Sequence, residues 1–306
     1  MNKLEQEKFE EFVKLQEKPL FILIMGMSGS GKTALARQFN KKFNIKSLSF
    51  EGIRKELERS EVFDVGYNEI VSMASERIRK KLERGESIIL DSPGLNSYRR
   101  AQFLKSLRDI DCVKACVMKM TDYNSCVLAQ DISAIPTEED IIWKQYESFQ
   151  VVTPTEGWDY VVRYTLNQGP SLEEIFEIGK NKFTKIFQHL EVATQMAIDR
   201  HFPSYLVNAV KYHDIGKFFS KVGEDEQEEE HIRHENIGAY LYALTSNDVN
   251  WLYVSNLILW HEVGYEMTTE KRNKIQKRFG KKFLNDLILL STINKESKNE
   301  IIENLI

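Results

Sequence analysis

The stretch GMSGSGKT at residues 26–33 constrains the fold of this chain more than any other feature. It matches the pattern G-x-x-x-x-G-K-[ST] and lies between an apolar run at residues 20–25 and a helix-forming segment at residues 32–43. In that context the glycines let backbone N–H groups converge on phosphate oxygens, and the helix N-terminus adds partial positive charge. The expected nucleotide-binding residues are Gly26, Ser28, Gly29, Ser30, Gly31, Lys32 and Thr33.

The last two residues of this loop carry the side chains that nucleotide chemistry needs. Lys32 is expected to reach the β- and γ-phosphates, and the hydroxyl of Thr33 is expected to bind Mg²⁺. The alternative is a Gly-rich turn that binds no nucleotide, but the strand before the loop and the helix after it favour binding. We therefore expect ATP and Mg²⁺ as cofactors.

The first half of the chain alternates short apolar runs with amphipathic segments. After the first strand, further strands are predicted at residues 45–50, 87–91, 112–120 and 159–166. The helices between them include residues 67–85, and also residues 137–150, where a mobile lid would lie. Strands that alternate with helices imply a parallel sheet with crossover helices, which is an α/β fold.

The strand signal stops at NQGPS, residues 167–171. Beyond it, helical length and spacing recur at residues 172–202, 203–213, 232–245, 250–262 and 281–293. We therefore predict two domains. Residues 1–168 form the α/β domain, with its lid at about residues 121–150, and residues 169–306 form an all-α domain.

Charged residues follow the predicted strands at the edge where α/β sheets bind ligands. Glu51 and Arg54 come just after the second strand, and Asp91 closes the third. Phosphoryl transfer needs a base near the attacking hydroxyl and cations around the transferred group, and these residues offer both. The alternative is that each of them, taken alone, is simply a helix-start or loop charge.

The loop, LSFEGIRKEL, IILDSPGLNSYRR and ESFQVVTPTEGWDYV together resemble the polynucleotide 5′-kinase family of P-loop phosphotransferases, over about residues 20–165. The resemblance implies that Glu51 is the base for the 5′-hydroxyl and that Arg54 contacts an acceptor phosphate. It also implies roles for Asp91 and for Arg99 or Arg100. The family has Asp where this chain has Glu51.

The lid of that family usually carries arginines that stabilise the transferring phosphate. Residues 121–140 of this chain contain no Lys or Arg, and the next cation is Lys144. A flexible ammonium group does not replace the planar guanidinium fork of an arginine. ATP binding is thus a firmer expectation for this domain than rapid kinase turnover.

All six histidines of the chain lie between residues 189 and 261. His189 lies within a predicted helix, His213 is followed by Asp214, and His261 ends a helix. His231 and His234, three residues apart, are predicted to share one helical face. A lone histidine is more often structural than a ligand, but several with an adjacent carboxylate are typical of a divalent metal site.

The segments HLEVA, HDIGK, HENIGAY and LWHE resemble, in that order, the signatures of the HD-domain phosphohydrolases, over about residues 172–300. The resemblance implies that His189, His213 and Asp214 bind one metal. It implies that His234 and His261 bind a second metal or the substrate phosphate, and that Lys217 holds phosphate. His231 is a less certain participant, and His201 is predicted to end a helix.

The HD family usually closes its site with a late Asp, and here that position falls on Asn294. An amide oxygen can bind a metal but brings no charge, so a lower metal affinity is expected. The alternative is that Asp286 is the residue that closes the site. The expected metal is a divalent ion such as Mn²⁺, Co²⁺ or Ni²⁺.

Composition and charge limit the expected cellular compartment and the expected binding partners. The three cysteines form no Cys-x-x-Cys, the N-terminus is charged rather than apolar, and the run at residues 19–27 is too short to cross a bilayer, so we expect a cytoplasmic chain without a membrane partner. The net charge of −4 falls in residues 169–306, much of it in the acidic stretch 223–230. A broad duplex clamp would be basic, so any nucleic-acid contact is expected to be a local grip on an end.

These features together predict a bifunctional nucleic-acid end-healing enzyme. A P-loop kinase domain would phosphorylate a 5′-OH, and an HD-type domain would remove a 3′- or 2′,3′-cyclic phosphate, with RNA favoured over DNA as in RNA repair. Two alternatives stay open: a small-molecule or nucleoside kinase with nucleotide phosphohydrolase activity, and an ATP-binding sensor with a degenerate HD site. Homo-oligomers are also left open.

Overall fold

The structure is a computed structural model that describes residues 3–59, 66–133, 136–165, 169–220, 231–264 and 267–303. The acidic stretch 223–230 and part of the expected domain boundary at 167–171 lie outside these residues. By its contacts the chain divides into two compact units, Met1–Ile142 with Glu156–Asn167, and Trp143–Thr155 with Gln168–Ile306. Among the described residues, no helix has both the length and the apolarity that crossing a membrane requires.

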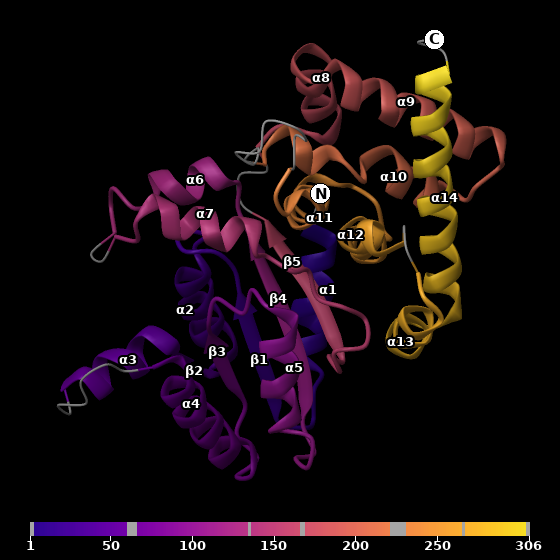
Figure 1. Ribbon diagram of the computed structural model, residues 1–306. Coiled ribbons are helices and arrows are strands. Elements are labelled where there is room, and N and C mark those ends of the chain that lie inside the picture. Colours follow the sequence, from indigo (N-terminus) through magenta and orange to yellow (C-terminus); the bar gives the residue numbers. More distant parts are fainter. Residues whose placement is uncertain are drawn as a thin grey trace. The chain divides into compact units, whose positions relative to one another are not determined.

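The first unit is a parallel five-stranded sheet with the strand order β2-β3-β1-β4-β5 (Figure 1). The parallel register runs from β2 through β3, β1 and β4 to β5. This confirms the predicted α/β fold, because neighbouring parallel strands need crossover connections. The elements of this part of the chain are α1 (Lys3–Lys14), β1 (Leu20–Met25), α2 (Lys32–Phe43), β2 (Lys46–Ser49), α3 (Phe50–Arg59), α4 (Tyr67–Leu82), β3 (Ile88–Asp91), α5 (Ser97–Lys105), β4 (Val113–Met120), α6 (Tyr123–Leu128), α7 (Glu139–Glu147) and β5 (Tyr160–Thr165).

Strand β1 is buried along its whole length because helices cover both faces of the sheet. On one face, Phe9 of α1 and Phe39 of α2 pack with Ile22 and Ile24 in a single hydrophobic cluster. On the other face, Phe21 stacks against Phe103 of α5. Two such layers fix β1 in the centre of the sheet, so the loop that follows it leaves from the middle of the carboxyl edge.

The second unit is helical, as predicted for the second half of the chain. Its elements are α8 (Leu172–Lys182), α9 (Thr184–Asp199), α10 (Ser204–Tyr212), the short helix η1 (Ile215–Phe218), α11 (His234–Thr245), α12 (Trp251–Trp260), the short helix η2 (His261–Gly264), α13 (Thr269–Phe279) and α14 (Lys281–Glu303). The single helix expected at residues 172–202 is wrong, because the backbone breaks at Phe183 with φ −131° and ψ 57°. Helix α13 was not among the helices predicted from the sequence.

The segment Trp143–Thr155 belongs to the helical unit although it lies between β4 and β5 in the sequence. Phe149 is fully buried and packs edge-on against Tyr240 of α11, with ring centroids 4.7 Å apart. The side chain of Asn236 donates to the Glu147 carbonyl (2.7 Å), and that of Asn256 donates to the Val152 carbonyl (3.0 Å). The compact units therefore differ from the expected domains in this segment, which includes the second part of the expected lid.

Candidate functional site

The phosphate loop follows β1 directly and bends into α2 through glycines in the left-handed region. Gly29 has φ 79° and Gly31 has φ 85°, values that a residue with a Cβ rarely adopts. A Cβ on Gly29 would lie 2.2 Å from the carbonyl oxygen of Cys126, so this glycine also permits a close approach of two backbones. The sequence spacing therefore produces the expected strand, loop and helix.

The side chains that end the loop contact other parts of the first unit. Lys32 Nζ donates to the Met27 carbonyl (3.2 Å), and the hydroxyl of Thr33 donates to Asp91 Oδ2 (2.6 Å). Burial lowers the pKa of Lys32, although the charges of Asp91 and Glu51 oppose this shift. Burial raises the pKa of Asp91, against the charge of Lys32 and the hydrogen bond from Thr33. Thr33 and Asp91 thus form one pair of oxygen ligands that suits Mg²⁺.

A second lysine, which sequence reasoning missed, lies against the same loop. Lys119 on β4 is only 2% exposed, and its Nζ donates to the Thr121 hydroxyl (3.2 Å), which donates in turn to the Ser30 carbonyl (3.0 Å). A Cβ on Gly31 would lie 3.6 Å from Lys119 Cε. Burial lowers the pKa of Lys119 to about 8. Its position at the carboxyl end of a strand was the one available signal.

The predicted acceptor residues divide into exposed and structural ones. Glu51 and Arg54 are exposed on α3, where Glu51 pairs with Lys55 at 2.7 Å. Arg100 is buried in a bidentate pair with Glu156, at 2.8 and 2.7 Å, so it has a structural role. Arg99 is exposed, and its guanidinium lies 4.1 Å from the centre of the Tyr67 ring. Of the two arginines left open by the sequence, Arg99 is the one available to a ligand.

A pocket of about 190 Å³ lies beside the end of β3 in the first unit. Its wall includes Ser92, next to Asp91 in the sequence, together with the exposed Arg99. Most of the remaining lining is apolar or aromatic and includes Phe50, Tyr67, Phe103 and Trp158. This pocket has room for a small acceptor group with a flat face. Lys144 lies elsewhere, exposed on the segment that groups with the helical unit.

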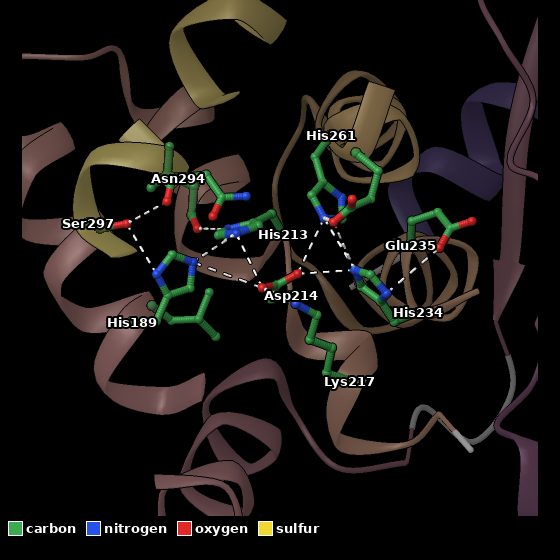
Figure 2. Close-up of polar contacts among 12 residues, drawn as sticks. His189, His213, Asp214, Lys217, His234, Glu235, His261, Asn294 and Ser297 are labelled. Carbon is green, nitrogen blue, oxygen red and sulfur yellow. Dashed lines mark hydrogen bonds and ion pairs between the residues drawn. The ribbon is translucent and has the colours of Figure 1, made fainter. Parts of the chain in front are cut away.

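The histidine cluster of the second unit is centred on Asp214, which begins η1 (Figure 2). Its two carboxylate oxygens face different histidines. Oδ1 lies 3.2 Å from His234 Nε2 and 3.3 Å from His261 Nε2, while Oδ2 lies 3.6 Å from His213 Nε2 and 3.9 Å from His189 Nε2. Lys217 Nζ donates to Oδ2 at 2.8 Å. The described residues thus form two groups with metal-ligand geometry, and Asp214 belongs to both.

The second group contains a carboxylate that the sequence reading did not assign. Glu262 Oε1 lies 3.1 Å from His261 Nε2 and 3.6 Å from His234 Nε2. Glu262 is the second residue of η2, the short helix that starts at His261. The segment LWHE contains Glu262, so the acid directly after His261 was the feature of the sequence that could have indicated this ligand. Its oxygen supplies the negative charge that Asn294 lacks.

The HD family closes its metal site with an Asp late in the sequence, and the two candidates for that position here are Asn294 and Asp286. Neither of them brings a carboxylate to these groups. Asp286 Oδ2 accepts hydrogen bonds from Tyr205 (3.1 Å), Tyr253 (2.7 Å) and Lys282 (2.9 Å), so the alternative that it closes the metal site is not supported. Asn294 is 1% exposed, and neither polar atom of its side chain has a hydrogen-bond partner. Figure 2 shows it beside His189 and His213.

Backbone carbonyls orient the histidine rings of the cluster. Nδ1 of His213 lies 2.7 Å from the Val210 carbonyl, Nδ1 of His261 lies 2.7 Å from that of Ile258, and Nδ1 of His234 lies 2.9 Å from that of His231. A carbonyl can only accept, so Nδ1 carries the proton and Nε2 is left to the interior. His231 therefore acts through its backbone, and it precedes α11 instead of sharing a helical face with His234.

The cluster has an excess of hydrogen-bond acceptors. Nε2 of His189 lies 3.3 Å from that of His213, and Nε2 of His234 lies 3.3 Å from that of His261. Where both Nε2 atoms carry lone pairs, as in the His189–His213 pair, this separation is repulsive unless a cation lies between them; burial lowers the pKa of His189 to about 4. Burial lowers the pKa of His213 to about 3, whereas hydrogen bonds to Asp214 and Glu262 outweigh burial and raise the pKa of His234 to about 9. Burial opposes ionisation of Asp214, but the charges and hydrogen bonds around it hold its pKa well below the usual value. The donor set therefore fits divalent metal ions.

Lys298 is a further residue that sequence reasoning missed. Burial lowers its pKa, and the charges of Asp214 and Glu262 act against that shift, so its ammonium group is in electrostatic range of the cluster. Together with Lys217 it gives the site positive charge outside the ligand groups. The signal available in the sequence was its place one helical turn after Asn294.

Comparison with known proteins bears on the first unit. The model of a family described as an AAA domain matches residues 21–127. No curated protein matches the chain. Among solved structures, a gluconokinase from Sinorhizobium meliloti 1021 is 14% identical, covers 48% of this chain and 83% of its own, and has a TM-score of 0.35. A shikimate kinase from Acinetobacter baumannii, in complex with shikimate, is 12% identical, covers 50% and 88%, and has a TM-score of 0.32.

The family match agrees with the topology of the first unit. The matched residues run from β1 to α6 and include the loop, Thr33, Asp91 and Lys119. A parallel sheet of five strands, with the phosphate loop leaving its central strand, agrees with that match. The first unit of this chain is therefore a parallel α/β unit that carries a P-loop and is similar, over residues 21–127, to the AAA domain.

Proposed function

We propose that the chain is a bifunctional nucleic-acid end-healing enzyme. The first unit transfers the γ-phosphoryl group of ATP to a 5′-hydroxyl, and the second removes a 3′- or 2′,3′-cyclic phosphate with the help of divalent metal. RNA is the favoured substrate, because broken RNA with a 5′-OH and a cyclic or 3′-phosphate needs both steps before ligation. The three free, buried cysteines agree with the reducing cytoplasm predicted from the sequence.

Three observations in the first unit support the kinase half. Lys32 and Lys119 place two cations at the loop, and the Thr33–Asp91 pair provides oxygen ligands for the Mg²⁺ that accompanies ATP. The charge of Glu51 acts on both Lys32 and Asp91, so Glu51 is near the place where a base is needed. Lys119 offers a source of positive charge that the arginine-free lid does not provide.

One observation carries the hydrolase half: Asp214 faces two groups of histidines at once. Residues His189 and His213 on one side, and His234, His261 and Glu262 on the other, would hold divalent metal ions with Asp214 between them. Such an ion, when bound, lowers the pKa of a water molecule and provides a nucleophile at neutral pH. Lys217 and Lys298 would bind phosphate oxygens of the substrate, because both are cations at the edge of the ligand groups. Asn294 adds a neutral amide beside His189.

Both proposed reactions balance in atoms and in charge. In the first unit, the bond between the β,γ-bridging oxygen and the γ-phosphorus breaks, a bond from the 5′-oxygen to that phosphorus forms, and the hydroxyl proton passes to Glu51. In the second unit, water attacks phosphorus, the bond to the sugar oxygen breaks, and that oxygen takes up a proton. Opening a cyclic phosphate requires one such attack, and release of inorganic phosphate requires another.

A pair of oligonucleotide assays tests both halves. The first gives the protein a 5′-OH oligonucleotide with γ-labelled ATP and Mg²⁺, and the second gives it a 3′-phosphate oligonucleotide with Mn²⁺, Co²⁺ or Ni²⁺. Lys32→Ala should lower only the first activity and Asp214→Ala only the second, each by about 10³-fold. Lys41→Ala, in the last turn of α2, and Asp199→Ala, at the end of α9, are matched controls.

Absence of transfer to any oligonucleotide would refute the kinase half. Absence of metal-dependent phosphate release from oligonucleotides would refute the hydrolase half. Loss of both activities in either single variant would contradict two separate sites.

The small volume of the pocket beside β3 favours a second candidate. A space of about 190 Å³ lined by Phe50, Tyr67 and Trp158 suits one nucleoside better than a nucleic-acid strand. In that case the enzyme is a nucleoside kinase joined to a nucleotide phosphohydrolase. Label transferred to free nucleosides, with oligonucleotides left unlabelled, would support this candidate over end healing.

A further inference from the structure

A pocket separate from the histidine cluster lies in the second unit between the end of α12, η2 and α13. It has a volume of about 250 Å³. Apolar and cationic residues line it together: Trp260, Val263, Lys271, Lys274, Ile275, Arg278 and Phe279. The Trp260 and Phe279 rings are 5.2 Å apart at an angle of 65°. The Arg278 guanidinium lies 5.1 Å from the centre of Trp260 and 5.2 Å from that of Phe279.

The helix that borders this pocket is strongly basic within an acidic half of the chain. Residues 169–306 hold 17 Lys and Arg and 21 Asp and Glu, and residues 269–282 account for seven of the cations but only one of the acids. Within the described part of the chain, Arg272, Lys277 and Lys281 are exposed and form no ion pair. A positive surface therefore adjoins the pocket.

These charges oppose the helix that carries them. Lys271, Lys274 and Arg278 follow each other at spacings of three and four residues, where like charges repel. Lys271 and Arg272 also lie near the positive end of the helix dipole. The Thr268 cap, which accepts a hydrogen bond from the Lys271 amide (3.2 Å), and the buried Ile275 stabilise the helix. Glu270 also pairs with Lys274 (2.7 Å), and the cations of the last turn favour the negative end of the helix dipole. Seven cations against one acid over residues 269–282 leave an excess of positive charge that suits a polyanionic ligand.

One short segment connects the pocket with the histidine cluster. Trp260 and Val263 line the pocket, and the two residues between them, His261 and Glu262, belong to the cluster. A strand whose terminal phosphate is bound in the cluster would therefore meet the walls of this pocket with an adjoining nucleotide.

We propose that the pocket and the basic face of α13 bind single-stranded nucleic acid. An unpaired base packs against Trp260 and Phe279, and neighbouring phosphates contact Lys271, Lys274 and Lys277. Base stacking on aromatic rings combined with Lys and Arg contacts to the backbone is how proteins hold single strands. The inference rests on the proposed function, because it identifies how the substrate of the second unit is held beyond its end.

Fluorescence anisotropy of a labelled single-stranded oligonucleotide with the full-length chain, without ATP, tests this site. The variant Lys271→Gln with Lys274→Gln should bind about 10- to 30-fold more weakly at 0.1 M salt, and the slope of log K against log salt should fall by about 1.4. Lys182→Gln with Lys185→Gln removes the same charge from exposed positions of α8 and α9 and should bind like the parent chain. Phe279→Leu should weaken binding several-fold without changing that slope, because it removes stacking alone.

Equal affinity of the two double variants would overturn the proposal. So would competition by an acidic peptide at the same concentrations as the oligonucleotide, which would assign the face to a protein partner. Phosphate release from a 3′-phosphate oligonucleotide, measured in parallel, separates this outcome from failure of the proposed function. Release with unchanged binding in the α13 variant refutes only the site, whereas specific binding without any release refutes only the hydrolase.

Discussion

The phosphate loop and the histidine cluster differ in how their polar side chains are paired within the protein. At the loop, Lys32 donates to a backbone carbonyl and Thr33 donates to Asp91, so both find partners within the protein. In the cluster, the Nε2 atoms of four histidines and two carboxylates converge, and Lys217 donates to one of these carboxylates, Asp214. The cluster gathers more charged groups and ring nitrogens in one place than the loop does, so we expect bound metal to stabilise the second unit more than bound nucleotide stabilises the first.

Removing metal should affect the second unit far more than removing nucleotide affects the first. An ion held at about a thousand times its dissociation constant stabilises a fold by about 4 kcal/mol. For a unit of this size, chelation should lower the melting temperature by about 8 to 16 °C. Differential scanning calorimetry with and without chelator measures this, with omission of ATP as the comparison. A melting temperature that chelation leaves unchanged would contradict this difference between the two units.

Truncation of Phe149 should show that the segment between β4 and β5 belongs structurally to the helical unit. Phe149→Ala opens a cavity against Tyr240 and should destabilise that unit by about 3 to 5 kcal/mol. Ile141, which lies on α7 just before this segment and is 44% exposed, provides the control: Ile141→Ala should cost less than about 0.5 kcal/mol. Urea unfolding followed by tryptophan fluorescence reports both. Similar small effects of the two changes would place the segment outside the core of the helical unit.

Glu262→Gln should weaken metal binding by about 10- to 100-fold, because it removes the charge next to Nε2 of His261 and His234. Glu235→Gln is a matched control, since Glu235 Oε2 lies 3.9 Å from Nδ1 of His234, on the opposite side of that ring. Isothermal titration with Mn²⁺ compares the two. An equal loss in both variants would show a general charge effect and not a ligand.

Lys119→Met should weaken ATP binding by about fivefold and flatten its pH dependence. Burial lowers the pKa of Lys119 to about 8, so its charge, and with it the affinity for ATP, should fall as the pH rises through about 8. The same shift has the opposite sign for stability, because the unfolded chain binds more protons between about pH 8 and 10.5, so folding is favoured as the pH rises there. Titration of a fluorescent ATP analogue between pH 7 and 9 measures the binding effect, with Lys114→Met on the same strand as the control. A parent affinity that is independent of pH would contradict this role.

Local patterns were enough to predict the sheet and the loop. Apolar runs and a glycine motif specify strand, turn and helix within a few residues, so β1, the loop and α2 follow from the sequence alone. The break at Phe183 could not be predicted, because the apolar spacing continues across it. The membership of Phe149 in the helical unit depends on contacts with α11, far away in the sequence.

The cluster could be predicted in its histidines and Asp214 but not in its full charge. HDIGK indicated a ligand pair, and the clustering of histidines indicated where its partners were. The choice between Asn294 and Asp286 required the structure, because only the structure shows Asp286 bonded to Tyr205, Tyr253 and Lys282. Glu262 was overlooked because an exposed acid after a histidine is common and only the turn of η2 brings its oxygen to the cluster.

The metal content of the purified chain tests the central claim most directly. If Asp214 joins two ligand groups, elemental analysis should find about two divalent ions per chain in the parent protein, and Asp214→Ala should lose both. Lys32→Ala should retain them, because its site is in the other unit. A parent chain that contains no metal and takes none up from Mn²⁺, Co²⁺ or Ni²⁺ would contradict the account and favour an ATP-binding sensor.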